Sequence, residues 1–231
     1  MLTGGELAII ALSLKVATTA MAAALPFAFL VAWALARWRF RGRGLLQAVT
    51  TLPLVLPPVV TGYALLVWFG ANGPLGWLLR ETTGLEFAFR WTGAALAAAV
   101  MGFPLLVRPI RLSLEAIDPG LEEAAKTLGA SRLRILVTVV LPLAFPGILA
   151  GIILGFAKAL GEFGATITFV SNIPGQTQTL SLAIYSLLQS PTGDAAALRL
   201  IAFSVFLAIG AILASEWVAS RLPSVKKARN G

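Results

Sequence analysis

The chain has 231 residues, of which 58% are apolar and only 12% are charged, which is about half the charged fraction of an ordinary soluble domain. Lys and Arg outnumber Asp and Glu by 18 to 10, but the basic residues gather in short segments between apolar runs, a pattern typical of membrane orientation rather than nucleic-acid binding. The chain has no Cys and no His, which excludes disulfides, thiolate chemistry, Ser-His-Asp catalysis and the usual zinc ligands.

Three long stretches carry no charged residue, namely residues 44–79, 135–157 and 200–215. A helix needs about 20 apolar residues to cross the hydrocarbon core of a bilayer, and a water-soluble core would not require so many runs of this length. We therefore predict an all-α integral membrane protein in which residues 1–231 form a single transmembrane domain.

The first predicted span covers residues 7–36 and is followed by Arg37, Arg39, Arg41 and Arg43. Because basic loops stay on the cytoplasmic side, this loop is expected in the cytoplasm and the amino terminus outside. The second predicted span, 45–70, returns to the outside, and the third, 91–112, comes back in.

The second half of the chain continues this alternation. A polar, mixed-charge loop at about 115–134 is expected in the cytoplasm, the fourth span covers 135–157, and the last covers 200–218. The last span delivers a basic cytoplasmic tail over residues 221–231. About five spans, with the amino end outside and the carboxyl end inside, satisfy every basic cluster.

The segment from about 161 to 194 is too polar at its centre to face lipid. A sixth span here would also place the basic tail outside. We predict a loop and a short helix, about 181–189, on the outer side or buried within protein, since irregular backbone at membrane depth needs such shielding.

Several spans contain residues that shape helices. Pro57 and Pro58 lie within the second predicted span, and prolines there indicate either tolerated kinks or helices shaped around a pathway. Gly147, Gly151 and Gly155 repeat every four residues in the fourth span, a spacing that predicts close helix packing.

The loop at 115–134 contains the signals of a short capped helix. Asp118 is a good amino-terminal cap and Pro119 suits the first turn. Glu122 and Glu123 follow where the helix dipole favours negative charge, and Gly129 is placed to end the helix in a left-handed conformation. The pattern predicts a helix that lies at the cytoplasmic surface.

One stripe of this helix is apolar, formed by Leu121, Ala124, Ala125 and Leu128 at three- and four-residue spacing. Such a stripe is compatible with docking to a partner protein, and equally with an ordinary amphipathic helix in a cytoplasmic loop. The residues alone leave both interpretations open.

Residues 123–142 resemble the signature of ABC-importer permease subunits, which is Glu-Ala-Ala, a Gly six residues after the Glu, and then Ile-x-Leu-Pro. This chain has Glu123-Ala124-Ala125, Gly129 and Val139-Val140-Leu141-Pro142, so the one departure is Val139 in place of Ile. The order of spans fits the type I importer fold over essentially the whole chain. Residues 160–166 and 172–175 resemble the molybdate branch more narrowly, with sulfate and tungstate permeases as close relatives.

The resemblance implies that the short helix is a coupling helix that sits in a groove on an ATPase subunit. The matched docking positions are Glu123, Ala124, Ala125 and Gly129, with Glu122, Leu121 and Asp118 as neighbours. Small alanine side chains would let the helix seat closely, and Glu123 would offer a carboxylate to donors on the ATPase.

The sequence contains no Gly-Lys-Ser or Gly-Lys-Thr and therefore no phosphate loop. The chain is accordingly expected to be a transport subunit rather than an enzyme, to bind no metal or cofactor, and to leave ATP and Mg to a separate ATPase subunit. The resemblance implies a second copy of the chain, two ABC ATPase subunits and a periplasmic or extracellular oxyanion-binding protein, all assembled at the cytoplasmic (inner) membrane.

Candidate pathway residues lie near the outer end of the fourth span and just beyond it. Lys158 and Glu162 are one turn apart; they could contact the ion, since ionisable groups at membrane depth are functional candidates, or could simply neutralise each other. Further donors for an outer gate are Thr166, Thr168, Ser171 and Asn172.

The favoured hypothesis is the pathway subunit of an ATP-driven, binding-protein-dependent oxyanion importer, with molybdate as the favoured ion. Sulfate, thiosulfate and tungstate are the alternatives within the family. An ATP-independent channel or secondary transporter is a more distant alternative. Secondary transporters place charged or unwound elements at the midplane, and the middle thirds of the predicted spans have none. A membrane-embedded enzyme is disfavoured by the lack of His, Cys and clustered carboxylates.

Overall fold

The structure, a computed structural model, describes residues 2–220, so the predicted basic tail at 221–231 lies outside the described residues. Within this range all regular secondary structure is helical, as expected for an all-α protein. The elements in chain order are α1 (Gly4–Arg37), α2 (Arg43–Val55), α3 (Pro58–Phe69), α4 (Pro74–Thr83), α5 (Trp91–Ala116), α6 (Pro119–Thr127), α7 (Arg132–Ile135), the π-helix η1 (Leu136–Val140), α8 (Leu141–Leu160), α9 (Gly164–Val170), α10 (Leu180–Leu188) and α11 (Asp194–Ser220).

Four of these helical stretches are long and apolar enough to cross a membrane, namely α1, α5, the continuous run α7–η1–α8 and α11. Helices α2 and α3 together meet the same criteria but are bent by 113°. Counting this bent pair as one broken span gives five spans, which agrees with the predicted number. The first, third, fourth and fifth spans are longer than predicted, and the fifth begins at Asp194 rather than near residue 200.

The second predicted span, 45–70, is not one straight helix, because the helix breaks between α2 and α3. Leu56 is extended, with ψ of 146°, as the residue before a proline prefers to be. Pro57 follows, and Pro58 occupies the first turn of α3, where its missing N–H costs nothing. The prolines thus stop one helix and start the next in a new direction.

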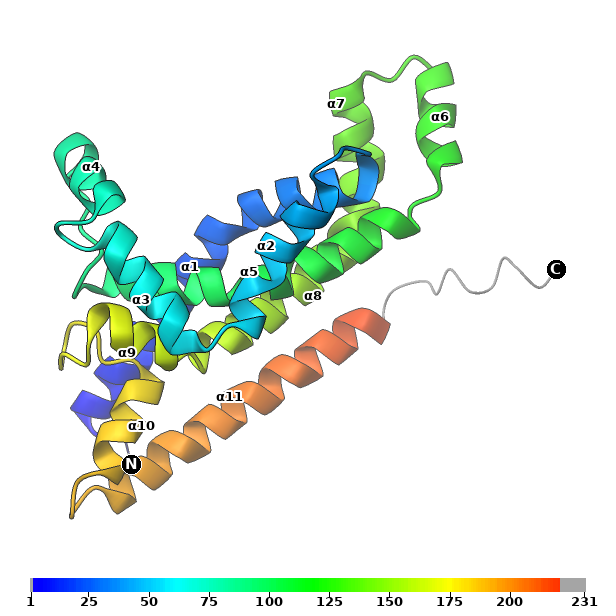
Figure 1. Ribbon diagram of the computed structural model, residues 1–231. Coiled ribbons are helices and arrows are strands. Elements are labelled where there is room, and N and C mark those ends of the chain that lie inside the picture. Colours follow the sequence, from blue (N-terminus) through cyan, green and yellow to red (C-terminus); the bar gives the residue numbers. More distant parts are fainter. Residues whose placement is uncertain (1, 221–231) are drawn as a thin grey trace.

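The core of the bundle is formed by α5 packed between α1 and α8 (Figure 1). The predicted packing role of the glycine row is confirmed. A Cβ on Gly151 would lie 2.9 Å from the Leu106 carbonyl oxygen of α5, and one on Gly155 would lie 2.6 Å from the Met21 sulfur of α1. Only glycine permits helices to approach so closely.

The fourth span begins as α7, passes through one π-helical segment and continues as α8. The π segment ends two residues before Pro142, which has no N–H to donate and whose ring would crowd the preceding turn of an α-helix. Widening the helix at this point accommodates the proline within one continuous span.

The polar segment at 161–194 contains two short helices instead of one. Helix α10 matches the predicted 181–189, but α9 was missed. Helix α9 packs against α3 so closely that a Cβ on Gly62 would lie 2.5 Å from the Ala165 carbonyl oxygen. Tertiary packing, rather than a helical pattern in seven residues, stabilises α9, and protein shields this backbone as expected.

The two ends of the bundle differ in what they carry (Figure 1). Helices α6 and α7 lie at one end, close to the end of α1 and the start of α2. Helices α9 and α10 lie at the opposite end together with the amino-terminal part of α1. Helix α11 runs along the side of the bundle, in contact with α8 and α10.

Candidate functional site

Helix α6 is capped by local contacts at both ends. The Asp118 carboxylate accepts a hydrogen bond from the backbone N–H of Gly120 at 2.8 Å. At the other end Gly129 has a φ of +81°, and the N–H of Ala130 donates to the carbonyl of Ala125 at 3.0 Å. The helix boundaries and both caps agree with the prediction from sequence. Local capping of this kind lets a short helix form without burial.

The outer side of α6 is open. No residue of the helix is buried, and Leu121 is 49% exposed while Leu128, just beyond the helix, is 88% exposed. Glu123 and Ala124 are also exposed, and Ala125 is half-buried against the core. The predicted docking positions are therefore mostly accessible, Leu121 among them, and Leu128 of the same apolar stripe is almost fully exposed.

Glu122 takes a different position from Glu123. A carboxylate oxygen of Glu122 lies 2.6 Å from the Arg37 guanidinium at the end of α1, and both side chains are about one-fifth exposed. Within residues 2–220 no ion pair involves Glu123. Glu122 thus ties α6 to α1, whereas Glu123 is left available to a partner.

Lys158 and Glu162 form an ion pair of 2.8 Å, and the Glu162 side chain is almost fully buried. The second carboxylate oxygen of Glu162 accepts a hydrogen bond from the backbone N–H of Ala165 at 3.0 Å. The pair joins the end of α8 to the start of α9. These contacts favour the self-neutralising interpretation of the two.

The four predicted gate donors lie in or beside α9, and several already have partners. The Thr168 hydroxyl donates to the Gly164 carbonyl at 2.8 Å, and Thr166 is only 2% exposed. The Asn172 amide donates to the Ser186 hydroxyl of α10 at 2.5 Å. Ser171 has a φ of +60°, and its carbonyl accepts a hydrogen bond from Thr177. These residues hold the segment together, and a gate role stays a prediction.

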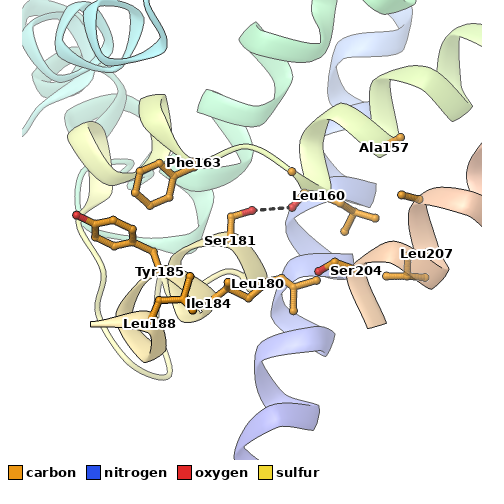
Figure 2. A pocket seen from close by; sticks show the side chains of 12 residues that line it. Ala157, Leu160, Phe163, Leu180, Ser181, Ile184, Tyr185, Leu188, Ser204 and Leu207 are labelled. Carbon is orange, nitrogen blue, oxygen red and sulfur yellow. Dashed lines mark hydrogen bonds between the residues drawn. The ribbon is translucent and has the colours of Figure 1, made fainter. Parts of the chain in front are cut away.

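A cavity of about 470 Å³ lies between the end of α8, α10 and α11 (Figure 2). Figure 2 shows apolar side chains around it, with Phe163 and Tyr185 side by side at 4.9 Å between ring centroids. The hydroxyl of Ser181 already donates to the Leu160 carbonyl at 3.1 Å. This cavity offers little to an oxyanion.

Two ionic features were not singled out from the sequence. Arg108 and Arg111 of α5 line a polar cavity between α2 and α5. Two arginines three residues apart in an apolar run could have pointed to a shared polar site from the sequence. The second is the Glu6–Arg199 pair, at 2.7 Å, which links the first turn of α1 to the second turn of α11. No sequence signal connects residues so far apart in the chain.

Comparison with known proteins finds three kinds of likeness. Residues 24–223 match the family described as binding-protein-dependent transport system inner membrane component. The chain is 55% identical to molybdenum transport system permease proteins of Haemophilus influenzae and Escherichia coli K12, over 94% of this chain and 95% of each relative. It is 41% identical to a sulfate transport system permease protein of Salmonella typhimurium, over 78% of this chain and 66% of that protein.

Solved structures share the fold. A bacterial ABC transporter involved in alginate import superposes with a TM-score of 0.72 at 17% identity, covering 96% of this chain and 82% of that one. An amino acid ABC transporter superposes with a TM-score of 0.61 at 18% identity, covering 94% of this chain and 93% of that one. The expected importer permease fold is confirmed.

Proposed function

The chain belongs to the binding-protein-dependent transport system inner membrane components, and from this premise we propose that it forms the translocation pathway of an ATP-driven molybdate importer. Identity of 55% along nearly the whole chain to two molybdenum permeases supports molybdate. The sulfate permease is a weaker match in both identity and coverage, so sulfate, thiosulfate and tungstate are the alternatives.

The observation that carries the mechanism is helix α6. It is short, capped by its own residues and buried nowhere, and it is tied to the bundle by the Glu122–Arg37 ion pair. A partner that pushed on α6 would therefore move the ends of α1, α5 and α7 together. In the proposed assembly α6 is the coupling helix, and Glu123, Ala124 and the exposed leucines meet the ATPase.

The proposed assembly contains two copies of this chain, two ABC ATPase subunits and an external oxyanion-binding protein. One solved structure with the same fold is an alginate transporter in complex with its ligand-bound periplasmic protein, which supports the last of these. ATP and Mg would bind the ATPase, because the chain has no phosphate loop. Nucleotide and loaded binding protein would have to favour one state by about 5 kcal/mol to switch it almost completely.

The proposed orientation places the α6 end in the cytoplasm and the amino terminus outside. Arginines at 37, 39, 41 and 43 lie at the end that also carries the basic residues of α6 and α7, and basic segments stay inside. Helices α9 and α10 would then face the external binding protein.

The test is ATP hydrolysis by the chain reconstituted with its candidate ATPase and binding protein. Molybdate is expected to stimulate hydrolysis and to be taken up into vesicles, and a tenfold excess of sulfate is expected not to compete. Stimulation by sulfate in preference to molybdate would overturn the substrate assignment. Uptake of molybdate without any ATPase would favour the channel or secondary-transporter alternative.

A further inference from the structure

A polar cavity of about 440 Å³ lies between α2 and α5, toward the end of the bundle that carries α6. Half of its twelve lining residues are polar or charged: Gln47, Thr50, Thr51, Arg108, Arg111 and Glu115. A second cavity beside α2, of about 500 Å³, has Thr50 as its one polar lining residue. The polar lining therefore distinguishes the first cavity from an ordinary gap between apolar helices.

Arg108 lies within a membrane-spanning helix rather than at its end. Ala116, the last residue of α5, is eight residues further along, which is about 12 Å at the rise of an α-helix. A charged side chain on a membrane-spanning helix almost always faces the bundle interior or a water-filled cavity. Because Arg108 is exposed and lines the polar cavity, that cavity is where its charge is solvated.

The polar residues around Arg108 already form some hydrogen bonds with one another. Arg111 donates from Nε to Glu115 at 2.8 Å and from Nη1 to the Gln47 side-chain oxygen at 3.1 Å. The second contact leaves the Gln47 NH₂ group free to donate elsewhere. The hydroxyls of Thr50 and Thr51 donate to carbonyls of their own helix, so the donors left for a ligand are those of the arginines and Gln47.

The charge of the cavity is positive. Arg108 has no ion-pair or hydrogen-bond partner within residues 2–220, and the single carboxylate, Glu115, is shared between Arg111 at 2.8 Å and Arg43 at 3.6 Å. Two guanidinium groups and one carboxylate thus line the space. A guanidinium presents several donors in one plane, which suits the oxygens of a tetrahedral oxyanion.

We propose that this cavity is a weak oxyanion site on the release side of the pathway, in which Arg108 contacts the ion and Gln47 and Arg111 lie beside it. The inference rests on the proposed function, because it assigns the ion that the chain is proposed to carry. A site on a pathway must attract the ion and still let it leave. The partial neutralisation by Glu115 meets the second requirement.

The phosphate of an anionic lipid such as phosphatidylglycerol, whose charge is not balanced by a choline as in phosphatidylcholine, could reach the same group. The test therefore uses the full complex of this chain, its ATPase and its binding protein in vesicles of phosphatidylcholine alone and in vesicles that also contain phosphatidylglycerol. Uptake of radiolabelled molybdate is measured together with basal ATP hydrolysis and with the amount of ATPase that co-purifies.

Arg108→Gln is expected to lower molybdate uptake about tenfold in both kinds of vesicle, because one unit charge near a dianion is removed. Basal ATP hydrolysis and assembly are expected to remain. Arg108→Lys keeps the charge but not the planar donors, so its molybdate uptake should lie between that of the native complex and that of Arg108→Gln. If Arg108→Gln does not assemble, Arg108→Lys provides the test instead. The matched control Arg41→Gln removes an exposed charge at the same end of the bundle and should change uptake by less than about twofold.

If the Arg108→Gln complex takes up molybdate at the native rate, the proposed site is overturned while the proposed function stands. A loss of uptake confined to vesicles with phosphatidylglycerol would overturn it in favour of the headgroup of an anionic lipid. A native complex that takes up no molybdate would overturn the proposed function, and this assignment with it, so the two failures are distinguishable.

Discussion

The two ends of the bundle both contain short helices between spans, yet they are built in opposite ways. At one end α6 buries no residue fully, caps itself and contacts the bundle through the Glu122–Arg37 ion pair and the half-buried Ala125. At the other end α9 and α10 are packed into the core, with Phe169, Val170 and Leu182 fully buried. Hydrogen bonds from Asn172, Ser181 and Thr177 join this second region internally.

Helix α6 is therefore accessible to a partner protein, whereas α9 and α10 are fixed by contacts within the bundle. A helix with its own caps and an open apolar stripe can exchange water for a partner without loss of internal contacts. Helices that share buried contacts and hydrogen bonds with three other elements cannot move independently. Substitutions at the α9–α10 end should therefore change stability, whereas substitutions on α6 should change association.

The largest effect on stability is expected from Gly62→Ala. The new Cβ would lie 2.5 Å from the Ala165 carbonyl oxygen and 2.8 Å from the Thr168 Cβ, so α3 and α9 would have to separate, at a cost of about 3 kcal/mol. Thermal unfolding in mild detergent measures this. The matched control is Gly210→Ala on α11, where nothing lies within 4 Å of the new atom; equal melting temperatures for the two variants would contradict the packing.

A smaller loss is expected from Glu162→Gln, which keeps the hydrogen bond to the Ala165 N–H but leaves Lys158 without its counter-charge. Because Glu162 is buried while Lys158 is 30% exposed, the cost should be about 2 kcal/mol rather than the larger value of a fully buried pair. Adding Lys158→Met should restore most of the loss. If the double variant unfolds at the same temperature as the single one, the pair is not what links α8 to α9.

The smallest effect on stability is expected from Gly129→Val. The backbone at Gly129 has a φ of +81°, which costs a β-branched residue about 1–2 kcal/mol, but α6 buries nothing that could unfold the bundle with it. The melting temperature should stay within a few degrees while binding of the ATPase weakens. A large drop in melting temperature would show that α6 supports the core after all.

Much of this arrangement could be predicted from the sequence, and particular residues show why. Asp118, Pro119 and Gly129 act on their nearest neighbours, so α6 was placed correctly at both ends. The apolar runs gave the number of spans because a bilayer sets their length. The glycines at 147, 151 and 155 predicted a close helix contact, because their spacing places them on one helix face.

The remaining features depend on contacts that a linear pattern does not contain. The bend at Pro57 could be read as a kink but not as a turn of 113°. Helix α9 has seven residues and forms because α3 covers it. The Glu122–Arg37 pair joins residues 85 positions apart, so no local pattern could predict that Glu122 forms an ion pair within the chain while Glu123 stays exposed.

The central claim is that α6 docks on a separate ATPase through its open side, and co-purification tests it most directly. The native chain, Glu123→Lys and the control Glu81→Lys, an exposed acid on α4, are each purified with the candidate ATPase in mild detergent. The account predicts that the ATPase stays with the native chain and the control and is lost with Glu123→Lys, while all three chains melt at similar temperatures. If the ATPase remains bound to Glu123→Lys as it does to the native chain, or binds none of the three, the claim is contradicted.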